Sequence, residues 1–471
     1  MPSRPTPPHV PRSRPSPSRP PSSRPGGSRS SGALLDPYGI YGTRTATRLR
    51  DSRRRRRSQS FVLILVLAAL AALAVAAVKV RRIGSEPLLA RHELALPMAT
   101  PPLWIEAVPQ TTAASGSAQG VLLVAGEDGR LLQTELTQTT GETRKTLLLE
   151  TDFPLHAPLV FEETAFVPCE DGVLYAVSWR ERKLLWRRRF DAALTSQPAI
   201  LIINKKPVVF AGSDAGLLLA LDAATGKTVW QARLPAPLGS GLATIPASQT
   251  ATDAGTARIL IPLLGGAAMR GGLWCLEGAT GKILWRFPAD ARIEATQLAA
   301  PVVDEENGKI YAGNDTGAVF CLDLQTGKYN SPTSPGWKTF LKSLENHDQS
   351  QAVLVRAAPL LTGADANGNR SVIVGGNDGG VRCLGSDGKV RWVWDAGAPV
   401  SSLALVRGAD GRESVLVCSR STQLVLLDAA NGAAIKGFSS DGDHFVGVAL
   451  KSPTLFTATN QGAILQFALS Q

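Results

Sequence analysis

A short unit recurs along most of the chain, and this repetition constrains the fold more than any other feature of the sequence. The clearest copies read GLLLALDAATGKTVW at 216–230, GGLWCLEGATGKILW at 271–285 and GAVFCLDLQTGKYN at 317–330. Two further apolar segments precede most copies, the first often opened by Pro and the second ending in Gly and an acidic residue. Alternating apolar residues separated by Thr-Gly, Asp-Gly or Asn-Gly turns predict four short antiparallel strands per unit.

The spacing of the units predicts how many sheets they form. The residues that mark equivalent turns lie mostly 39 to 56 positions apart, with one gap of 63: Gly129, Gly172, Gly216, Gly272, Gly317, Gly380, Gln423 and Gly462. Four strands in roughly 45 residues is the size of a propeller blade, and eight blades can be counted. The last has only three strands, so we expect Leu88–Leu96 to complete it and Pro102–Val108 to open the first. The predicted fold class is all-β, an eight-bladed β-propeller of four-stranded antiparallel blades.

The unit ALDAATGKTVW, Ala220 to Trp230, resembles the repeat of the pyrroloquinoline-quinone-like β-propellers, and the resemblance extends over about Leu88 to Gln471. In that family a Trp at the end of each unit docks between neighbouring blades, and by resemblance this role falls to Trp186, Trp230, Trp285 and Trp392. Blades five and seven depart from the pattern, because Asn330 and Phe438 stand near the Trp location. The family includes quinone-dependent dehydrogenases and also the propeller subunit of the bacterial outer-membrane barrel-assembly machinery.

The cysteines argue against an enzyme of this family. Its dehydrogenases are longer and commonly place a vicinal Cys pair against the cofactor, whereas none of the five Cys here is followed by another Cys. Cys275, Cys321 and Cys383 share one repeat position, which suits a small core residue on a packed inner strand better than a metal site spread over three blades. We therefore expect no catalytic motif, no quinone and no other cofactor.

The charge of the chain is concentrated at its N-terminus. The formal net charge is +11, but residues 1–60 contain 14 Arg against two acids, Asp36 and Asp51, which gives 14 − 2 = +12. Residues 61–78 carry no charge, so the remainder carries 11 − 12 = −1, and a nucleic-acid partner is not expected. Pro, Ser and Arg dominate the first residues, which predicts a disordered tail over 1–60.

The segment Phe61–Val78, FVLILVLAALAALAVAAV, is predicted to cross a membrane as one helix, because eighteen apolar residues span about 27 Å. Arg53–Arg57 precede it and a weaker cluster follows. The positive side faces the cytoplasm, so we predict a single-pass protein of the bacterial inner membrane with a cytoplasmic N-terminus, a linker over 79–87 and a periplasmic propeller over 88–471.

Two loops are candidate sites. Asp365, Asn367 and Asn369 alternate like the oxygen ligands of a calcium loop, although only one is a carboxylate and an Asn-Gly hairpin turn explains the same residues. The gap of 63 residues contains Trp337, Phe340, Leu341 and Leu344 at helical spacing, which predicts a short amphipathic helix and an interaction site. The alternatives are a loop packed on its blade, and Trp337 as the displaced docking Trp of blade five.

These features predict a non-enzymatic, membrane-anchored propeller that binds protein partners of the cell envelope. Outer-membrane protein assembly is the role that the resemblance implies. The alternatives are a quinone- or calcium-dependent oxidoreductase that uses the central channel, and a sensor that binds a ligand and signals to the tail. The sequence assigns no oligomeric state.

Overall fold

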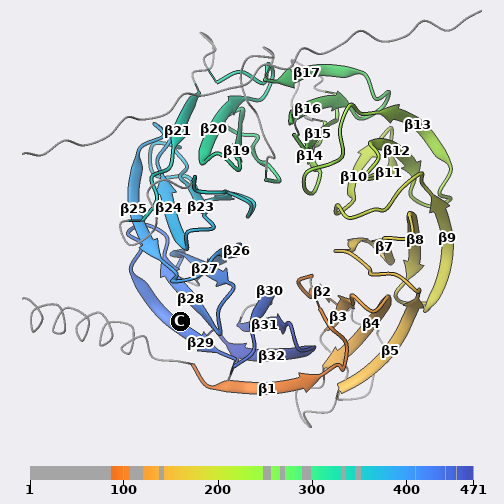
Figure 1. Cartoon of the computed structure of the whole chain (residues 1–471), viewed down its shortest axis with the longest axis horizontal. Helices are drawn as coiled ribbons and strands as arrows, with labels where there is room; N and C mark the ends of the chain where they lie inside the picture. The colour runs from red at the N-terminus through yellow and green to blue at the C-terminus, as the bar shows by residue number, and fades with distance from the viewer. Residues whose placement is uncertain are drawn as a thin grey trace, which may run out of the picture. The chain divides into compact units, whose positions relative to one another are not determined.

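The computed structural model shows eight four-stranded antiparallel sheets arranged as a ring among the residues that it describes (Figure 1). Those residues are 86–98, 100–106, 120–136, 143–247, 256–265, 271–288, 299–329, 336–344, 352–408, 410–440, 442–451 and 453–469. No helix occurs among them. The predicted fold class, an eight-bladed all-β propeller, is confirmed.

The first four blades contain strands β2 to β17. Blade one has β2 (Leu103–Glu106), β3 (Gly120–Ala125), β4 (Arg130–Leu136) and β5 (Thr143–Glu150). Blade two has β6 (Leu159–Phe161), β7 (Thr164–Pro168), β8 (Val173–Ser178) and β9 (Lys183–Arg189). Blade three has β10 (Ala199–Ile203), β11 (Lys206–Gly212), β12 (Leu217–Asp222) and β13 (Thr228–Arg233). Blade four has β14 (Ala243–Ile245), β15 (Arg258–Leu263), β16 (Gly272–Glu277) and β17 (Ile283–Phe287).

The last four blades contain the remaining strands. Blade five has β18 (Val302–Asp304), β19 (Lys309–Gly313), β20 (Ala318–Asp323) and β21 (Trp337–Phe340). Blade six has β22 (Leu360–Leu361), β23 (Val372–Gly375), β24 (Gly380–Leu384) and β25 (Val390–Asp395). Blade seven has β26 (Val400–Arg407), β27 (Glu413–Ser419), β28 (Gln423–Asp428) and β29 (Ala434–Ser439). Blade eight has β30 (Phe445–Lys451), β31 (Thr454–Thr459), β32 (Ala463–Ala468) and β1 (Leu88–Glu93).

Blade eight closes the ring with strands from both ends of the propeller. Strand β1 pairs antiparallel with β32, and Arg91 lies opposite Leu465. In Figure 1 the orange strand β1 runs along the blue strand β32. This confirms the predicted closure, in which the segment beginning at Leu88 completes the last blade. The closure stabilises the ring because β1 covers the edge of β32 that would otherwise be unpaired.

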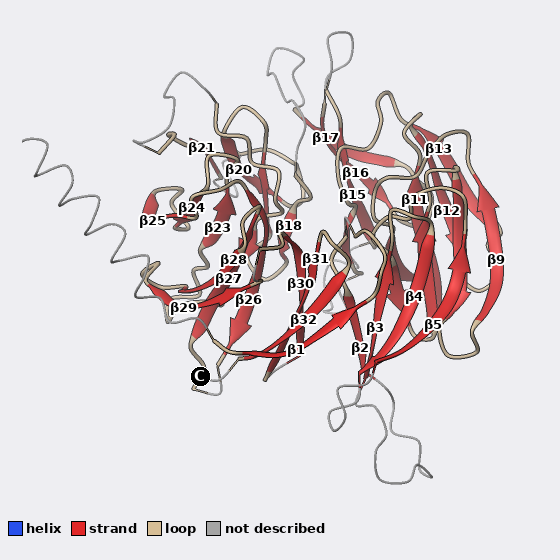
Figure 2. Ribbon diagram, turned by 60° about the horizontal axis from the view of Figure 1, so that its bottom comes forward, coloured by secondary structure: helices blue, strands red, loops and turns tan. Residues whose placement is uncertain are grey.

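The hydrophobic core lies between neighbouring blades. One cluster joins Leu123 of blade one to Val167 and Tyr175 of blade two, and another joins Phe166 of blade two to Val209 of blade three. The second and third strands of a blade are almost entirely buried, whereas outer strands such as β13 alternate between half-buried and exposed residues. Figure 2 shows β5, β9 and β13 along the outer rim. The outer strands on the rim are therefore more exposed than the second and third strands of each blade.

The predicted localisation requires a correction. No helix in the described part of the chain, which begins at residue 86, is long and apolar enough to cross a membrane. The structure thus overturns the placement as a single-pass inner-membrane protein, and we withdraw it. The segment Phe61–Val78 and the tail before it lie outside the described residues. The boundaries predicted for the tail, the linker and the propeller stay predictions.

Candidate functional site

Five tryptophans on outer strands contact the following blade. The indole N–H of Trp186 donates to the carbonyl oxygen of Ala223 at 2.9 Å, and that of Trp230 donates to Gly278 at 2.8 Å. The same bond joins Trp285 to Leu324, Trp337 to Ser386 and Trp392 to Ala429, at 3.3, 2.8 and 3.0 Å. A blade-docking role for these rings stays a prediction. It is supported by the bond that recurs at these five seams, as we call the contacts between neighbouring blades.

Each of these rings lies against a turn glycine of the next blade. A Cβ atom added to Gly226 would lie 2.7 Å from Trp186, and one added to Gly388 would lie 2.6 Å from Trp337. Both glycines have positive φ, +68° and +76°. Only glycine combines that backbone conformation with room for the indole, which explains why the Thr-Gly and Asp-Gly turns recur in the sequence.

The helix predicted around Trp337 is wrong. Residues Trp337–Phe340 form strand β21, and their exposure alternates with a period of two. Trp337 lies opposite Cys321, in the register that Trp230 has opposite Ala220, so strand pairing fixes this segment. The alternative that Trp337 is the displaced ring of blade five agrees with its hydrogen bond. Asn330, which stood near that location in the sequence, lies outside the described residues.

The other members of that predicted interaction site differ in exposure. Phe340 is 62% exposed on the outer rim, with the Lys338 ammonium 4.4 Å from the centre of its ring. Leu341 is buried in the core between blades five and six. The backbone N–H of Leu344 donates to Asp378 Oδ2 at 3.2 Å, which anchors the segment to blade six. Their role as an interaction site stays a prediction, now with Phe340 as its exposed apolar side chain.

Blade seven departs from the tryptophan pattern at Lys436. This residue lies opposite Leu426 beside the strand irregularity, the position that Trp392 takes opposite Cys383 in blade six. Lys436 forms an ion pair of 2.8 Å with Glu86, just before β1. Phe438, which the sequence placed near this position, is instead buried against Phe467 at a ring-centre distance of 5.3 Å. A polar contact thus replaces the indole where the ring closes.

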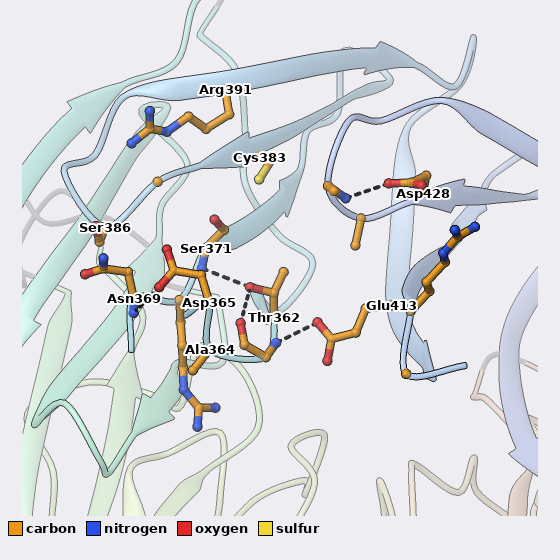
Figure 3. A pocket seen from close by; sticks show the side chains of 17 residues that line it. Thr362, Ala364, Asp365, Asn369, Ser371, Cys383, Ser386, Arg391, Glu413 and Asp428 are labelled. Atoms are coloured by element: carbon orange, nitrogen blue, oxygen red, sulfur yellow. Dashed lines mark hydrogen bonds between the residues drawn. The ribbon is translucent and has the colours of Figure 1, made fainter. Parts of the chain in front are cut away.

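A polar pocket of about 800 Å³ lies where blades six and seven meet (Figure 3). Hairpins of both blades form its walls, including the β22–β23 hairpin with Asp365 and Asn369. Its carboxylates already accept hydrogen bonds from backbone N–H groups, Glu413 from Gly363 at 2.6 Å and Asp428 from Ala430 at 2.8 Å. The pocket therefore offers hydrogen-bonding groups that have fixed orientations.

The three predicted calcium ligands form a hydrogen-bonded turn. Asp365 Oδ1 accepts the backbone N–H groups of Asn367 at 2.8 Å and Asn369 at 2.9 Å, and these bonds lower the pKa of its carboxyl group. Gly368 in the same turn has a φ of +77°. The hydrogen bonds agree with the hairpin alternative, while calcium binding stays a prediction. Across the described ranges no three His, Cys, Asp or Glu side chains gather as metal ligands.

The five thiols are buried, and each lies alone. Three of them lie directly opposite the seam tryptophan on the adjacent strand of their own blade: Cys275, Cys321 and Cys383. Burial raises the pKa of Cys275 to about 12 and that of Cys321 to about 11, and it also raises the pKa of Cys383 beside the polar pocket. These thiols are neutral at physiological pH and are poor nucleophiles. The thiols present do not fit the vicinal pair of a quinone site.

The outer strand of blade two is strongly basic, which sequence reasoning missed. Strand β9 and the turn before it read RERKLLWRRR over 180–189, with six cations and one acid. Summing the charge over the whole propeller to −1 hid this cluster. A charge count in a window of ten residues would have found it.

Comparison with protein families matches residues 99–245 and 262–470 to the family described as outer membrane protein assembly factor BamB. The chain belongs to this family. A BamB from Burkholderia pseudomallei is 27% identical over 222 residues, which are 46% of this chain and 50% of that protein. A polyvinylalcohol dehydrogenase from Sphingopyxis is 25% identical over 311 residues, 58% of this chain and 42% of that enzyme. The matched part thus spans about half the length of these relatives of the BamB-family chain.

The architecture is shared more widely than the family. Sqt1 of Saccharomyces cerevisiae superimposes with a TM-score of 0.60 over 82% of this chain and 100% of its own, at 11% identity. At that identity the likeness concerns the fold alone. The BamB-family membership and the surface of this chain therefore carry the functional argument.

Proposed function

We propose that this BamB-family propeller is a scaffold that binds protein partners in the cell envelope and holds them on its outer rim. The observation that carries the proposal is a set of exposed apolar side chains on outer strands that, within the described structure, have one unpaired edge. Val229 is 52% exposed on β13, Val393 is 50% exposed on β25 and Phe340 is 62% exposed on β21. Exposed apolar side chains along free strand edges are typical of surfaces to which other chains add.

The rigidity of the ring supports the same function. The seam tryptophans, the buried core between blades and the β1–β32 pairing hold the rim strands in fixed relative positions. A preorganised surface loses little conformational entropy when a partner binds. The similarity to proteins named outer membrane protein assembly factors supports envelope assembly as the process.

Photo-crosslinking in cells tests the scaffold. A photo-reactive amino acid at Val229, Val393 or Phe340 of the full chain should give discrete adducts, and the neighbouring blades of Phe340 and Val393 should capture the same partner. The matched control is Asn367, which is exposed on the hairpin beside the polar pocket. Adducts from no rim position, or equal adducts at Asn367, would contradict binding on the rim.

The similarity to the polyvinylalcohol dehydrogenase favours oxidoreductase activity as the second candidate. The isolated, neutral thiols argue against a quinone site, so we place this function second. Purified full-length protein would be titrated with pyrroloquinoline quinone and calcium, with polyvinyl alcohol as substrate and an electron-accepting dye as the readout. Saturable quinone binding with dye reduction that requires the polymer would establish the enzyme instead of the scaffold.

A further inference from the structure

The arginines of β9 differ from the other cations of blade two because they have no acidic partner. Arg182 lies 3.0 Å from Glu135, and Arg180 pairs with Glu163. By contrast, none of the side chains of Arg187, Arg188 and Arg189 forms an ion pair with an acid of the described residues, and Arg189 donates only to the carbonyl oxygen of Asp171, at 3.3 Å. Three adjacent unpaired cations produce a local positive field on one strand.

The same strand has a free edge. β9 is the last strand of the sheet β6-β7-β8-β9, so it pairs with β8 on one side and with no strand on the other within the described structure. Figure 1 places it on the outer rim. Leu184 and Leu185 are 45% and 40% exposed at its beginning. Backbone groups, apolar side chains and cations thus lie together on seven consecutive residues.

Among the outer strands of the described residues, only β9 has three adjacent cations. The one cation of β13, Arg233, is paired with Asp191 at 2.6 Å. Arg286 of β17 lies over the Trp274 ring at 4.3 Å, and Lys436 of β29 is paired with Glu86. The blades repeat the same strand geometry, so the charge of β9 has no role that the fold itself explains.

We propose that the free edge of β9 binds an extended, acidic segment of a partner protein as an added fifth strand. Backbone hydrogen bonds supply the pairing, carboxylates of the segment contact Arg187 and Arg189, which are exposed on one face of the sheet, and its apolar side chains cover Leu184 and Leu185. This inference rests on the proposed scaffold function and names the chemistry of its partner.

Charge and backbone geometry select this occupant over others. The chain's own residues 1–60 carry +12 and are repelled by the strand. An anionic lipid surface would satisfy the arginines but would leave the backbone donors and acceptors of the edge without partners. A strand from an acidic segment satisfies both sets of groups.

Fluorescence anisotropy with the full-length protein tests the proposal. The probe is a labelled ten-residue peptide in which Glu alternates with Val, and its partner probe replaces each Val by Pro, which removes strand pairing and keeps the charge. We expect the Val peptide to bind at least about tenfold more tightly than the Pro peptide. The triple variant R187S/R188S/R189S should bind the Val peptide about tenfold more weakly, and R187K/R188K/R189K should retain most of the binding.

The controls separate local binding from attraction to the basic N-terminus. Arg233→Ser on β13 should leave the affinity unchanged, and circular dichroism of each variant should match the original protein. Equal binding of both peptides, or unchanged binding by the triple Ser variant, would overturn the proposal. So would arginine-dependent binding to vesicles containing phosphatidylglycerol with no preference for the Val peptide. If β9 does not bind the Val peptide while other rim positions still crosslink to a partner, the proposed scaffold function is retained and only this inference is wrong.

Discussion

The seams between blades and the outer edges of the blades are formed by adjacent residues. Their residues nevertheless repeat to different extents around the ring. On β9 the Trp186 ring binds the next blade, while Leu185 beside it faces solvent. The seams repeat the same indole, the same carbonyl acceptor and the same turn glycine around much of the ring. The edges repeat only the strand and differ in charge. The residues that pack one blade against the next are therefore repeated from blade to blade. The exposed residues of the outer strands, which do not pack against another blade, differ between blades.

The buried ion pair at the seam of blades five and six should show the largest effect on stability. Arg382 is 2% exposed, and it contacts both oxygens of Asp378 and the carbonyl of Lys342 at 2.7 Å. Arg382→Ala leaves a buried carboxylate without its partner and should lower the free energy of unfolding by about 3–5 kcal/mol. Urea denaturation of the original protein and the variant measures this loss. The exposed rim pair is the control, since Arg233→Ala should cost less than about 1 kcal/mol.

The same pair predicts a pH dependence. Burial alone raises the pKa of Asp378, but its hydrogen bond and charge interaction with Arg382 outweigh burial and leave the pKa lowered. A lowered folded-state pKa contributes stability that is present above the unfolded value, about 3.9, and is lost as the pH falls through the folded value. The original protein should thus have a larger free energy of unfolding than the Asp378→Asn variant from pH 8 to 5, and this difference should shrink below about pH 4. An advantage independent of pH would contradict the assignment.

The seam tryptophans of blades two and three should be equivalent. Both rings are half-buried and bind the next blade through the same bond, so Trp186→Ala and Trp230→Ala should each lower the free energy of unfolding by about 3 kcal/mol. Thermal and urea unfolding of the two variants measure the difference. Values more than about 1 kcal/mol apart would show that the seams are not interchangeable.

A glycine at a seam should tolerate alanine less well than a glycine with open space around it. Gly226 and Gly308 have similar positive φ, +68° and +62°, but only Gly226 has an indole where the methyl group would stand. We expect Gly308→Ala to cost about 1 kcal/mol from backbone strain, and Gly226→Ala about 2–3 kcal/mol from strain and the clash together. Equal losses would mean that Trp186 moves aside without cost.

The seam cysteines should be chemically silent and replaceable. With a pKa of about 11, the Cys321 thiol is ionised to roughly one part in a thousand at pH 8. Iodoacetamide should label none of the five thiols in the folded protein and all of them in urea, as mass spectrometry would show. Leu185→Cys on the β9 edge is the reactive control. Cys321→Ala should cost only about 1 kcal/mol, because blades two and three carry Ala at that position.

The sequence predicts the seams well because the repeat encodes them. Turn spacing predicted eight blades, and the three strands of the last unit predicted that the segment from Leu88 closes the ring. Sequence spacing failed at Trp337–Leu344, because four residues fit a helical period by chance and the pairing of Trp337 with Cys321 is a tertiary constraint. It also placed Phe438 near the Trp position, although Lys436 follows the turn glycine Gly432 at the spacing that Trp230 has after Gly226.

The candidate sites were harder to predict from the sequence. The calcium-like spacing of Asp365, Asn367 and Asn369 is equally the spacing of a turn, and only hydrogen bonds distinguish the two. The basic edge needed the knowledge that residues 183–189 form an outer strand with a free side, because six cations in a row of ten say nothing about where their strand lies.

Hydrogen exchange along the rim tests the central claim. The claim is that outer strands bind different partners, although the blades pack against one another through the same contacts. Full-length protein would be exchanged with and without the Glu-Val peptide, and the amides of β9 and β13 compared by mass spectrometry. We predict new protection over Lys183–Arg189 and none over Thr228–Arg233. Protection of both strands alike, or of neither at saturating peptide, would contradict the account.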